Sequence, residues 1–300
     1  MYNSAFFKFT AREKLKSCYL AAVIGALICM FPVYIRQLIS NMFNYELLAG
    51  RVIAEGIGLV IELFAINLFL IGFIKMLMEL NPAGETPRDK CSYDLIFHSY
   101  RSNFKNALKI TVLRELKIFL WALIAFIPAA LAILAIMLFV SVDSLSGFVS
   151  VLSEYAQNQT AENLAAAQEF MNSYFPHMSL YSLIYFAATI AASIPLIYKS
   201  FEYSMIPMIL ADNPDIKSKA AYKRTKDIMD GFRMRYFLIQ LSFLVYIMLA
   251  GLILLYSGSV LVYIIAKAVL MPYQYMTYLE FYRQRNEVIE YNIEKYGGSE

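Results

Sequence analysis

Long uncharged runs are the feature that most constrains how this chain can fold. Four stretches contain no charged side chain for between 19 and 31 residues: 17–35, 118–142, 170–198 and 236–266. A transmembrane helix needs about 20 mostly apolar residues to cross roughly 30 Å of hydrocarbon. The composition agrees, because 60% of the 300 residues are apolar and 16% are charged. Soluble domains average about 45–50% apolar residues and about 25% charged residues. We therefore predict a polytopic membrane protein and exclude a disordered chain, a secreted disulfide scaffold and a nucleic-acid-binding domain.

Two further features raise the predicted number of spans to six. Residues 52–76 are strongly apolar despite three charged side chains, because 63–74 is uncharged. The motif Ser257-Gly258-Ser259 divides the longest run into a hairpin of two spans. The sequence thus predicts an all-α bundle of six transmembrane helices with basic amphipathic helices on the cytoplasmic side. The spans are expected at about 17–35, 52–76, 118–140, 179–200, 237–256 and 260–279.

The distribution of Lys and Arg predicts the orientation. Of the 26 basic residues, 22 fall in the segments on one side of the membrane and two, Arg36 and Arg51, on the other. Because cytoplasmic loops carry the excess of positive charge, we expect a multi-pass cell-membrane protein with both termini in the cytoplasm. We interpret 1–300 as a single integral membrane domain, with an extracytoplasmic helical insertion at 141–178 and a cytoplasmic tail at 280–300.

A basic helical stretch precedes each outward-going span, and the clearest is 215–235. There Ala221, Thr225, Ile228 and Phe232 recur at helical spacing on one face. Such a helix can lie in the headgroup plane against anionic lipid. We therefore expect anionic headgroups on the cytoplasmic side as the partner, expect no nucleic acid, and leave a protein partner or a homo-oligomer open. The candidate headgroup ligands are Lys217, Lys219, Lys223, Arg224 and Lys226.

Three polar residues within the predicted spans are candidates for an intramembrane site: Glu62, Asn67 and Lys267. Charges at bilayer depth are costly, by about 2.5–3.5 kcal/mol each on insertion scales. Glu62 and Lys267 are each about two turns inside the outer end of a span, so their depth allows an ion pair. The three residues then line a polar site or an ion path. Alternatively, the pair fixes helix packing, or a shallow crevice wets both groups.

A second candidate group, Lys199, Glu202 and Tyr203, lies at the inner end of the fourth span between Pro195 and Pro207. A proline inside a span kinks the helix and frees carbonyl groups. The group is either a headgroup or anion site at the cytoplasmic mouth, or an interfacial anchor in which Lys199 snorkels to the surface.

No residue pattern in the sequence is typical of catalysis. Asp212 and Asp215 flank Asn213-Pro214, and a turn explains them better than a metal site does. His98 and His177 are predicted on opposite sides of the membrane and cannot share a site. The sequence shows no phosphate loop, nucleophile elbow, zinc spacing or Rossmann fingerprint. We therefore expect a protein that is not an enzyme, with no metal and no cofactor.

Residues 194–231 carry a family resemblance. Its elements are, in chain order, Ile194-Pro195, Lys199, Tyr203-Ser204-Met205, Leu210-Ala211-Asp212-Asn213-Pro214-Asp215 and Met229-x-Gly231. Together with Arg12-Glu13-Lys14-Leu15-Lys16, they resemble a bacterial integral-membrane family, domain of unknown function 975. The resemblance implies a multi-span membrane protein without an established activity. This chain departs from that family in its outer segment 141–180, which is longer than the usual connection.

Three classes of function remain open. We favour a non-enzymatic membrane protein that scaffolds, regulates or interacts with lipid, because the sequence lacks a catalytic pattern and its basic helices suit anionic lipid. The alternative is a small-solute transporter or channel that uses Glu62 and Lys267. A membrane-embedded lipid enzyme is less favoured, because the inner segments lack clustered His and Asp.

Overall fold

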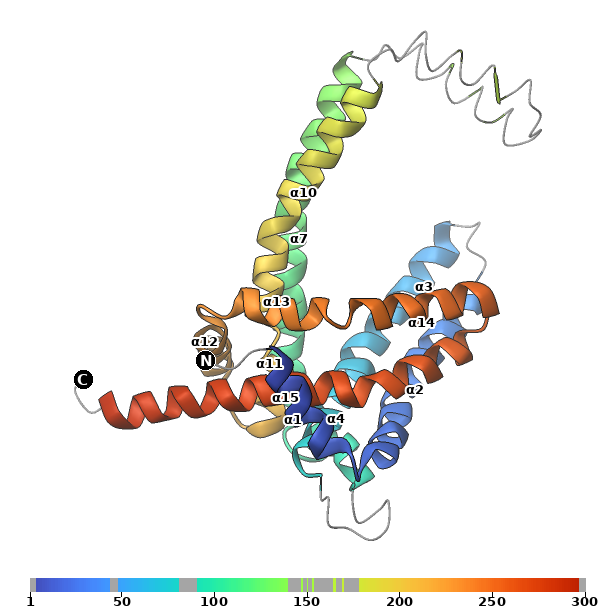
Figure 1. Cartoon of the computed structure of the whole chain (residues 1–300). Helices are drawn as coiled ribbons and strands as arrows, with labels where there is room; N and C mark the ends of the chain where they lie inside the picture. Colours follow the sequence, from blue (N-terminus) through green and yellow to red (C-terminus); the bar gives the residue numbers. More distant parts are fainter. Residues whose placement is uncertain are drawn as a thin grey trace. The chain divides into compact units, whose positions relative to one another are not determined.

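The computed structural model of the chain describes residues 4–43, 48–80, 91–139 and 178–296, with six isolated positions between 140 and 177. Over these residues every regular element is a helix (Figure 1). The predicted all-α fold class is therefore confirmed for the described chain. The predicted insertion at 141–178 lies almost entirely outside the described residues.

Each predicted span overlaps helical structure, and turn residues 17–18 and 242–243 fall within two of the spans. The elements that the predicted spans overlap are α2 (Tyr19–Met42), α3 (Leu48–Ile61), the π-helical turn η1 (Glu62–Ile66), α4 (Asn67–Met78), α7 (Phe104–Phe139), α10 (Met178–Glu202), α13 (Arg233–Leu241), α14 (Leu244–Ser257) and α15 (Val260–Tyr296). The elements outside the predicted spans are α1 (Ser4–Leu15), η2 (Tyr93–Phe97), α6 (His98–Arg101), α11 (Ile206–Asp212) and α12 (Ser218–Met229).

Several helices are long and apolar enough to cross a membrane. In the described residues there are four such segments: Tyr19–Met42, Gly50–Met78, Leu183–Asp212 and Val260–Tyr291. The pair α13 and α14 makes a fifth if the two helices, bent by 42°, form one span. Helices of this length and hydropathy are typical of membrane-inserted proteins. The count of six spans, which includes 118–140 in α7, stays a prediction, as does the cytoplasmic placement of the basic helices.

The predicted hairpin turn at Ser257-Gly258-Ser259 is present. Gly258 has a φ of +60°, a backbone conformation that favours glycine. Its N–H donates to the Leu254 carbonyl oxygen at 2.9 Å and so ends α14. Helix α15 then runs without a break to Tyr296. The predicted tail at 280–300 therefore begins as a continuation of the last span's helix.

The basic stretch 215–235 contains two helices, α12 and the start of α13, where the sequence predicted one. Gly231, with a φ of +68°, lies in the turn between them. The predicted apolar face is confirmed, because Ala221, Thr225 and Ile228 are fully buried and α12 packs against α11 and α15.

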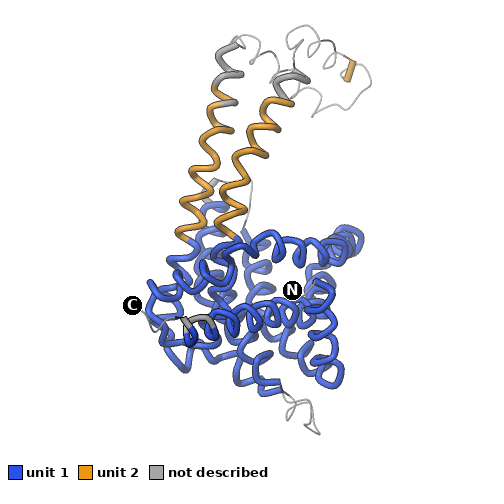
Figure 2. The backbone as a smooth tube through the Cα atoms, turned by 60° about the vertical axis from the view of Figure 1, so that its left-hand side comes forward, with its two compact units in different colours: residues 1–115, 201–300 blue, residues 116–200 orange. Residues whose placement is uncertain are grey.

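The chain forms two compact units, residues 1–115 with 201–300 and residues 116–200 (Figure 2). In the first unit, α15 packs against α2, α1 and α14, and α4 packs against η2 and α11. Aromatic rings meet edge to face in this core, as aromatic pairs prefer. Phe7 and Phe281 have ring centroids 5.7 Å apart, and Phe243 and Tyr273 are 5.4 Å apart. Helix α4 approaches η2 so closely that a Cβ added at Gly72 would lie 1.9 Å from the Ile96 carbonyl oxygen.

The second unit contains the C-terminal part of α7 and most of α10, which lie side by side in both views (Figures 1 and 2). Its large apolar side chains point outward: Phe126 is 62% exposed and Phe186 is 63% exposed. Contiguous apolar surface of this kind marks a membrane or interaction face. The surface of this helical pair therefore needs an apolar environment.

Candidate functional site

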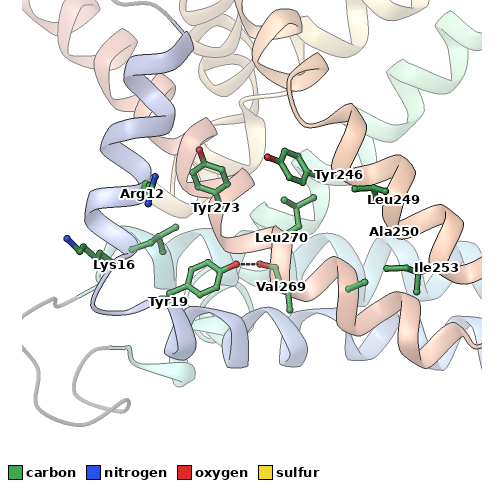
Figure 3. Close-up of a pocket in the computed structure, with 12 residues that line it drawn as sticks. Arg12, Lys16, Tyr19, Tyr246, Leu249, Ala250, Ile253, Val269, Leu270 and Tyr273 are labelled. Carbon is green, nitrogen blue, oxygen red and sulfur yellow. Dashed lines mark hydrogen bonds between the residues drawn. The ribbon is translucent and has the colours of Figure 1, made fainter.

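A groove of about 700 Å³ lies in the first unit, between the α1–α2 junction and the α14–α15 hairpin (Figure 3). Its volume is within the range of about 300–1,000 Å³ that is usual for small-molecule sites. All of its walls belong to the first unit. The groove is therefore the main candidate for a binding site in the described chain.

Basic side chains and a phenol gather on the α1–α2 side of the groove. Arg12 lies in the last turn of α1, Lys16 follows one helical turn later, and both are exposed. Tyr19, at the start of α2, donates a hydrogen bond to the Val269 carbonyl oxygen at 2.5 Å. This bond joins the start of α2 to α15 and fixes the phenol at the edge of the groove.

The other side of the groove is apolar. Leu249 and Ile253 of α14 line it together with Val269 and Leu270 of α15. Leu249 is 51% exposed even though it lies within a predicted span. Figure 3 shows the basic residues at one end of the groove and Leu249 and Ile253 at the other.

The two ends of the groove suit the two ends of an amphiphile. Arg12 and Lys16 place two positive charges at this end of the groove, where they attract an anionic head. In Figure 3 the Lys16 ammonium points outward from the groove. Tyr246 and Tyr273 carry hydroxyl groups on the helices opposite. The exposed apolar side chains of α14 and α15 can cover a hydrocarbon chain.

The structure does not bring the three intramembrane candidates together. Glu62 pairs with Arg36, with Oε2 and Nη1 2.8 Å apart. Asn67 donates from Nδ2 to the Glu62 carbonyl oxygen at 3.1 Å. Lys267 instead lies over the ring of Tyr263, with Nζ 5.5 Å from the centroid. The ion pair between Glu62 and Lys267 that their predicted depth allowed is absent from the described residues, and Arg36 takes the place of Lys267.

The second predicted group is divided between the two units. Glu202 lies in the first unit with a side chain only 3% exposed; its carboxylate is 3.4 Å from Lys226 Nζ and 4.0 Å from Arg233 Nη2. Tyr203 packs edge to face on Tyr222, with ring centroids 5.6 Å apart. Lys199 belongs to the second unit, where its Nζ lies 5.4 Å from the centre of the Trp121 ring. Glu202 is thus part of a buried charge cluster, which the sequence did not predict.

The five candidate headgroup ligands on and before α12 differ in their surroundings. Arg224 donates to Asn286 Oδ1 at 2.6 Å and pairs with Glu290 at 2.9 Å. Lys226 pairs with Glu202. The other three candidates, Lys217, Lys219 and Lys223, are exposed. Two of the five basic side chains therefore join α12 to the rest of the unit, and three remain on the surface.

Comparison with known families places the chain in one of them. Residues 1–287 match the family described as Protein of unknown function (DUF975). The chain belongs to the DUF975 family. No curated protein and no solved structure matches the chain. The family carries no assigned activity, so the groove has to be interpreted from its own geometry.

A buried carboxylate of this DUF975 chain, Glu280, was missed in the sequence. Lys14 Nζ lies 2.8 and 2.9 Å from its two oxygens, and Arg283 Nη1 donates to it at 3.0 Å. Arg283 also donates to the Met78 carbonyl oxygen at 3.1 Å. These contacts connect α1, α4 and α15. The sequence shows that Glu280 and Arg283 are close enough to pair on one helix. It does not show the contact with Lys14, because Lys14 lies 266 positions away from Glu280.

Cys91 and His98, which lie outside the predicted spans, both have shifted pKa values. Burial raises the pKa of the Cys91 thiol to about 12, and the nearby Cys18 acts in the same direction. Burial lowers the pKa of His98, as does the charge of Lys75, while Glu79 opposes them. The buried thiol of Cys91 is therefore a poor nucleophile, and burial favours the neutral form of His98.

Proposed function

We propose that this chain is a non-enzymatic, multi-pass membrane protein that binds an anionic lipid in the groove between α1–α2 and α14–α15. The observation that carries the proposal is the polarity of the groove, with Arg12 and Lys16 at one end and exposed apolar side chains at the other. An anionic lipid has the same two-ended chemistry.

The charge distribution supports a position of this groove in the inner leaflet. Arg12 and Lys16 precede the first predicted span, in the N-terminal segment that the positive-inside rule assigns to the cytoplasm. The cytoplasmic leaflet of many membranes is negatively charged, and each basic residue near such a surface contributes about 1 kcal/mol of attraction. The three exposed lysines Lys217, Lys219 and Lys223 reinforce this attraction on the proposed cytoplasmic face.

The apolar end supports a lipid over a water-soluble anion. Burying a Leu or Ile side chain fully contributes about 1.5–3 kcal/mol. Leu249, Ile253 and Val269 are each about half exposed in the groove, and a hydrocarbon chain would cover them. A soluble anion would leave this surface uncovered.

Solute transport is a second candidate, and one feature of the second span favours it. The turn η1 interrupts the α-helical hydrogen bonding at Glu62–Ile66, and such π-helical turns occur often at functional sites. The Tyr100 hydroxyl donates to the freed Phe64 carbonyl oxygen, and Arg114 Nη2 lies 3.5 Å from Asn67 Oδ1. These contacts place polar groups beside the break in the span.

The lipid proposal is tested with the double variant Arg12→Gln/Lys16→Gln. The full-length protein is purified in mild detergent with a fixed mixture of phosphatidylglycerol and phosphatidylcholine, and bound lipid is counted by native mass spectrometry. We expect the parent to retain phosphatidylglycerol preferentially and the double variant to lose most of that preference.

The matched control is Lys105→Gln/Lys109→Gln. These two lysines are also exposed and four residues apart, but they lie on α7 away from the groove. We expect the control to retain phosphatidylglycerol as the parent does. Equal retention by the parent and the groove variant would overturn the proposal.

A further inference from the structure

A second, smaller cavity of about 190 Å³ lies between α2, α14 and α15. Helix α15 supplies most of its lining with Lys267, Leu270, Met271 and Gln274. These positions are spaced by three and four residues, so they share one face of the helix. Met30 of α2 and two apolar residues of α14 complete the apolar wall. Lys267 and Gln274 are therefore among the residues that line a small cavity inside the predicted membrane region.

Lys267 differs from Glu62 and Lys75, two other charged residues in the predicted spans. Glu62 pairs with Arg36 at 2.8 Å, and Lys75 pairs with Glu79 at 2.9 Å. Lys267 makes no ion pair with any residue that the structure describes, and its cationic contact is with the ring of Tyr263. A charge at bilayer depth is stable only when something compensates it. The lining of the cavity contains no carboxylate that could do so.

The polar groups beside Lys267 are hydrogen-bond donors. Gln274 donates one N–H from Nε2 to the Tyr278 hydroxyl at 2.8 Å, which leaves its second N–H available. The Tyr275 hydroxyl makes no hydrogen bond within the described part of the chain. Its ring is held by edge-to-face packing on Phe73 and Tyr278. Lys267, Gln274 and Tyr275 all line this cavity, and each carries a hydrogen-bond donor that suits an anion.

We propose that this cavity binds a small monovalent anion, such as a halide or a short carboxylate, through Lys267, Gln274 and Tyr275. The single positive charge matches a single negative one. A volume of about 190 Å³ is below the range of about 300–1,000 Å³ found for drug-sized ligands, so the ligand is small. The bound anion supplies the negative charge that compensates Lys267, which no carboxylate among the described residues provides.

The anion site is separate from the lipid groove. The two share the apolar residues Ala250 and Leu270 as a common wall, but the cationic groups differ. Arg12 and Lys16 belong to the groove, and Lys267 belongs to the cavity. Loss of one site can therefore be measured while the other is intact, and a failure of the lipid proposal leaves the anion site untouched.

The test is an anion titration of the full-length protein in detergent. The thermal unfolding midpoint is measured at constant ionic strength while sodium gluconate, whose anion is bulky, is replaced by sodium chloride or sodium formate. A ligand that binds only the folded protein raises this midpoint as its concentration increases. We expect a saturating rise with chloride, formate or both, and its loss in Lys267→Met.

Two further variants keep the test decisive if Lys267→Met does not fold. Tyr275→Phe and Gln274→Leu each remove one donor to a charged ligand, and each is expected to raise the apparent dissociation constant about tenfold. The matched control is Lys75→Met, which removes another lysine within a predicted span and should keep the response. An unchanged midpoint in the parent protein, or the same rise in the parent and in Lys267→Met, would overturn the proposal.

Discussion

The two units of the molecule use similar apolar residues in opposite ways. In the first unit, Phe73 is completely buried and its ring packs on Tyr275 with centroids 6.1 Å apart. In the second unit, Phe126 is 62% exposed. Residue type alone therefore does not separate a side chain that packs against protein from one that faces the surroundings.

The difference lies in what accompanies the apolar residues. The first unit adds polar contacts between distant helices, such as Lys14 with Glu280 and Tyr282 with Asp212 at 2.9 Å. These contacts determine which face of each helix packs against the other helices of the first unit. The described part of the second unit is a pair of helices with exposed apolar side chains such as Phe126 and Phe186, which are available for lipid. We infer that the first unit carries the specific sites and the second carries generic contact with the bilayer.

The largest expected effect comes from truncating the same side chain in both units. Phe73→Ala removes a buried ring from the first unit, and such changes cost about 3–5 kcal/mol. Phe126→Ala removes an exposed ring from the second unit and should change stability by less than about 0.5 kcal/mol. The measurement is the fraction of monodisperse protein that survives a temperature series in detergent.

The comparison fails if the two phenylalanine variants lose stability equally. That result would mean that the outward face of the second unit packs against protein, for example in a homo-oligomer. The size of the detergent-solubilised particle, measured in parallel, identifies that case directly.

An intermediate effect is expected from the ion pairs of Glu280 with Lys14 and Arg283 in the first unit. Glu280→Gln leaves Lys14 and Arg283 facing a neutral amide, and an unsatisfied buried group costs about 1–3 kcal/mol. The lower part of this range applies, because the Lys14 side chain is 43% exposed and water screens it. Glu287→Gln, an exposed position on the same helix, is the control and should leave the unfolding midpoint unchanged. Equal midpoints for the two variants would show that the ion pairs of Glu280 do not stabilise the unit.

The smallest expected effect is a pH dependence from His98. Its pKa in the folded chain is lowered from 6.5 by burial and by Lys75, with Glu79 opposing. The unfolded chain therefore binds more protons just below pH 6.5, and stability decreases as the pH falls from there toward the folded pKa. We predict a larger drop in unfolding midpoint between pH 7.5 and pH 5.5 for the parent than for His98→Gln. An identical drop in both proteins would show that this histidine does not contribute.

Much of the fold could be predicted from local sequence patterns. Uncharged runs locate α2, α7, α10 and α14, and the turn at Gly258 follows from its Ser-Gly-Ser motif. The buried face of α12 follows from its helical spacing. The break at Gly231 was not predicted, since a basic amphipathic pattern continues on both sides of it. Local patterns thus identify helices and their inward faces, but they are less sensitive to breaks.

The candidate sites were harder to predict, because they depend on which helices meet. Arg12 and Lys16 were visible as a basic stretch, but nothing near them indicates that α14 and α15 complete the groove. The predicted depths of Glu62 and Lys267 allowed an ion pair between them, whereas α2 extends far enough to bring Arg36 to Glu62. Contacts between residues far apart in sequence are set by packing, which periodicity does not report.

The most direct test of the lipid-binding groove is photocrosslinking in a bilayer. The protein is reconstituted with a phosphatidylglycerol that carries a photoreactive group on its acyl chain, and the adducts are mapped by mass spectrometry. We predict adducts on Leu249, Ile253 or Val269 that unlabelled phosphatidylglycerol displaces more effectively than phosphatidylcholine does. Adducts confined to the outward faces of α7 and α10, with no preference between the two lipids, would contradict a specific site in the groove.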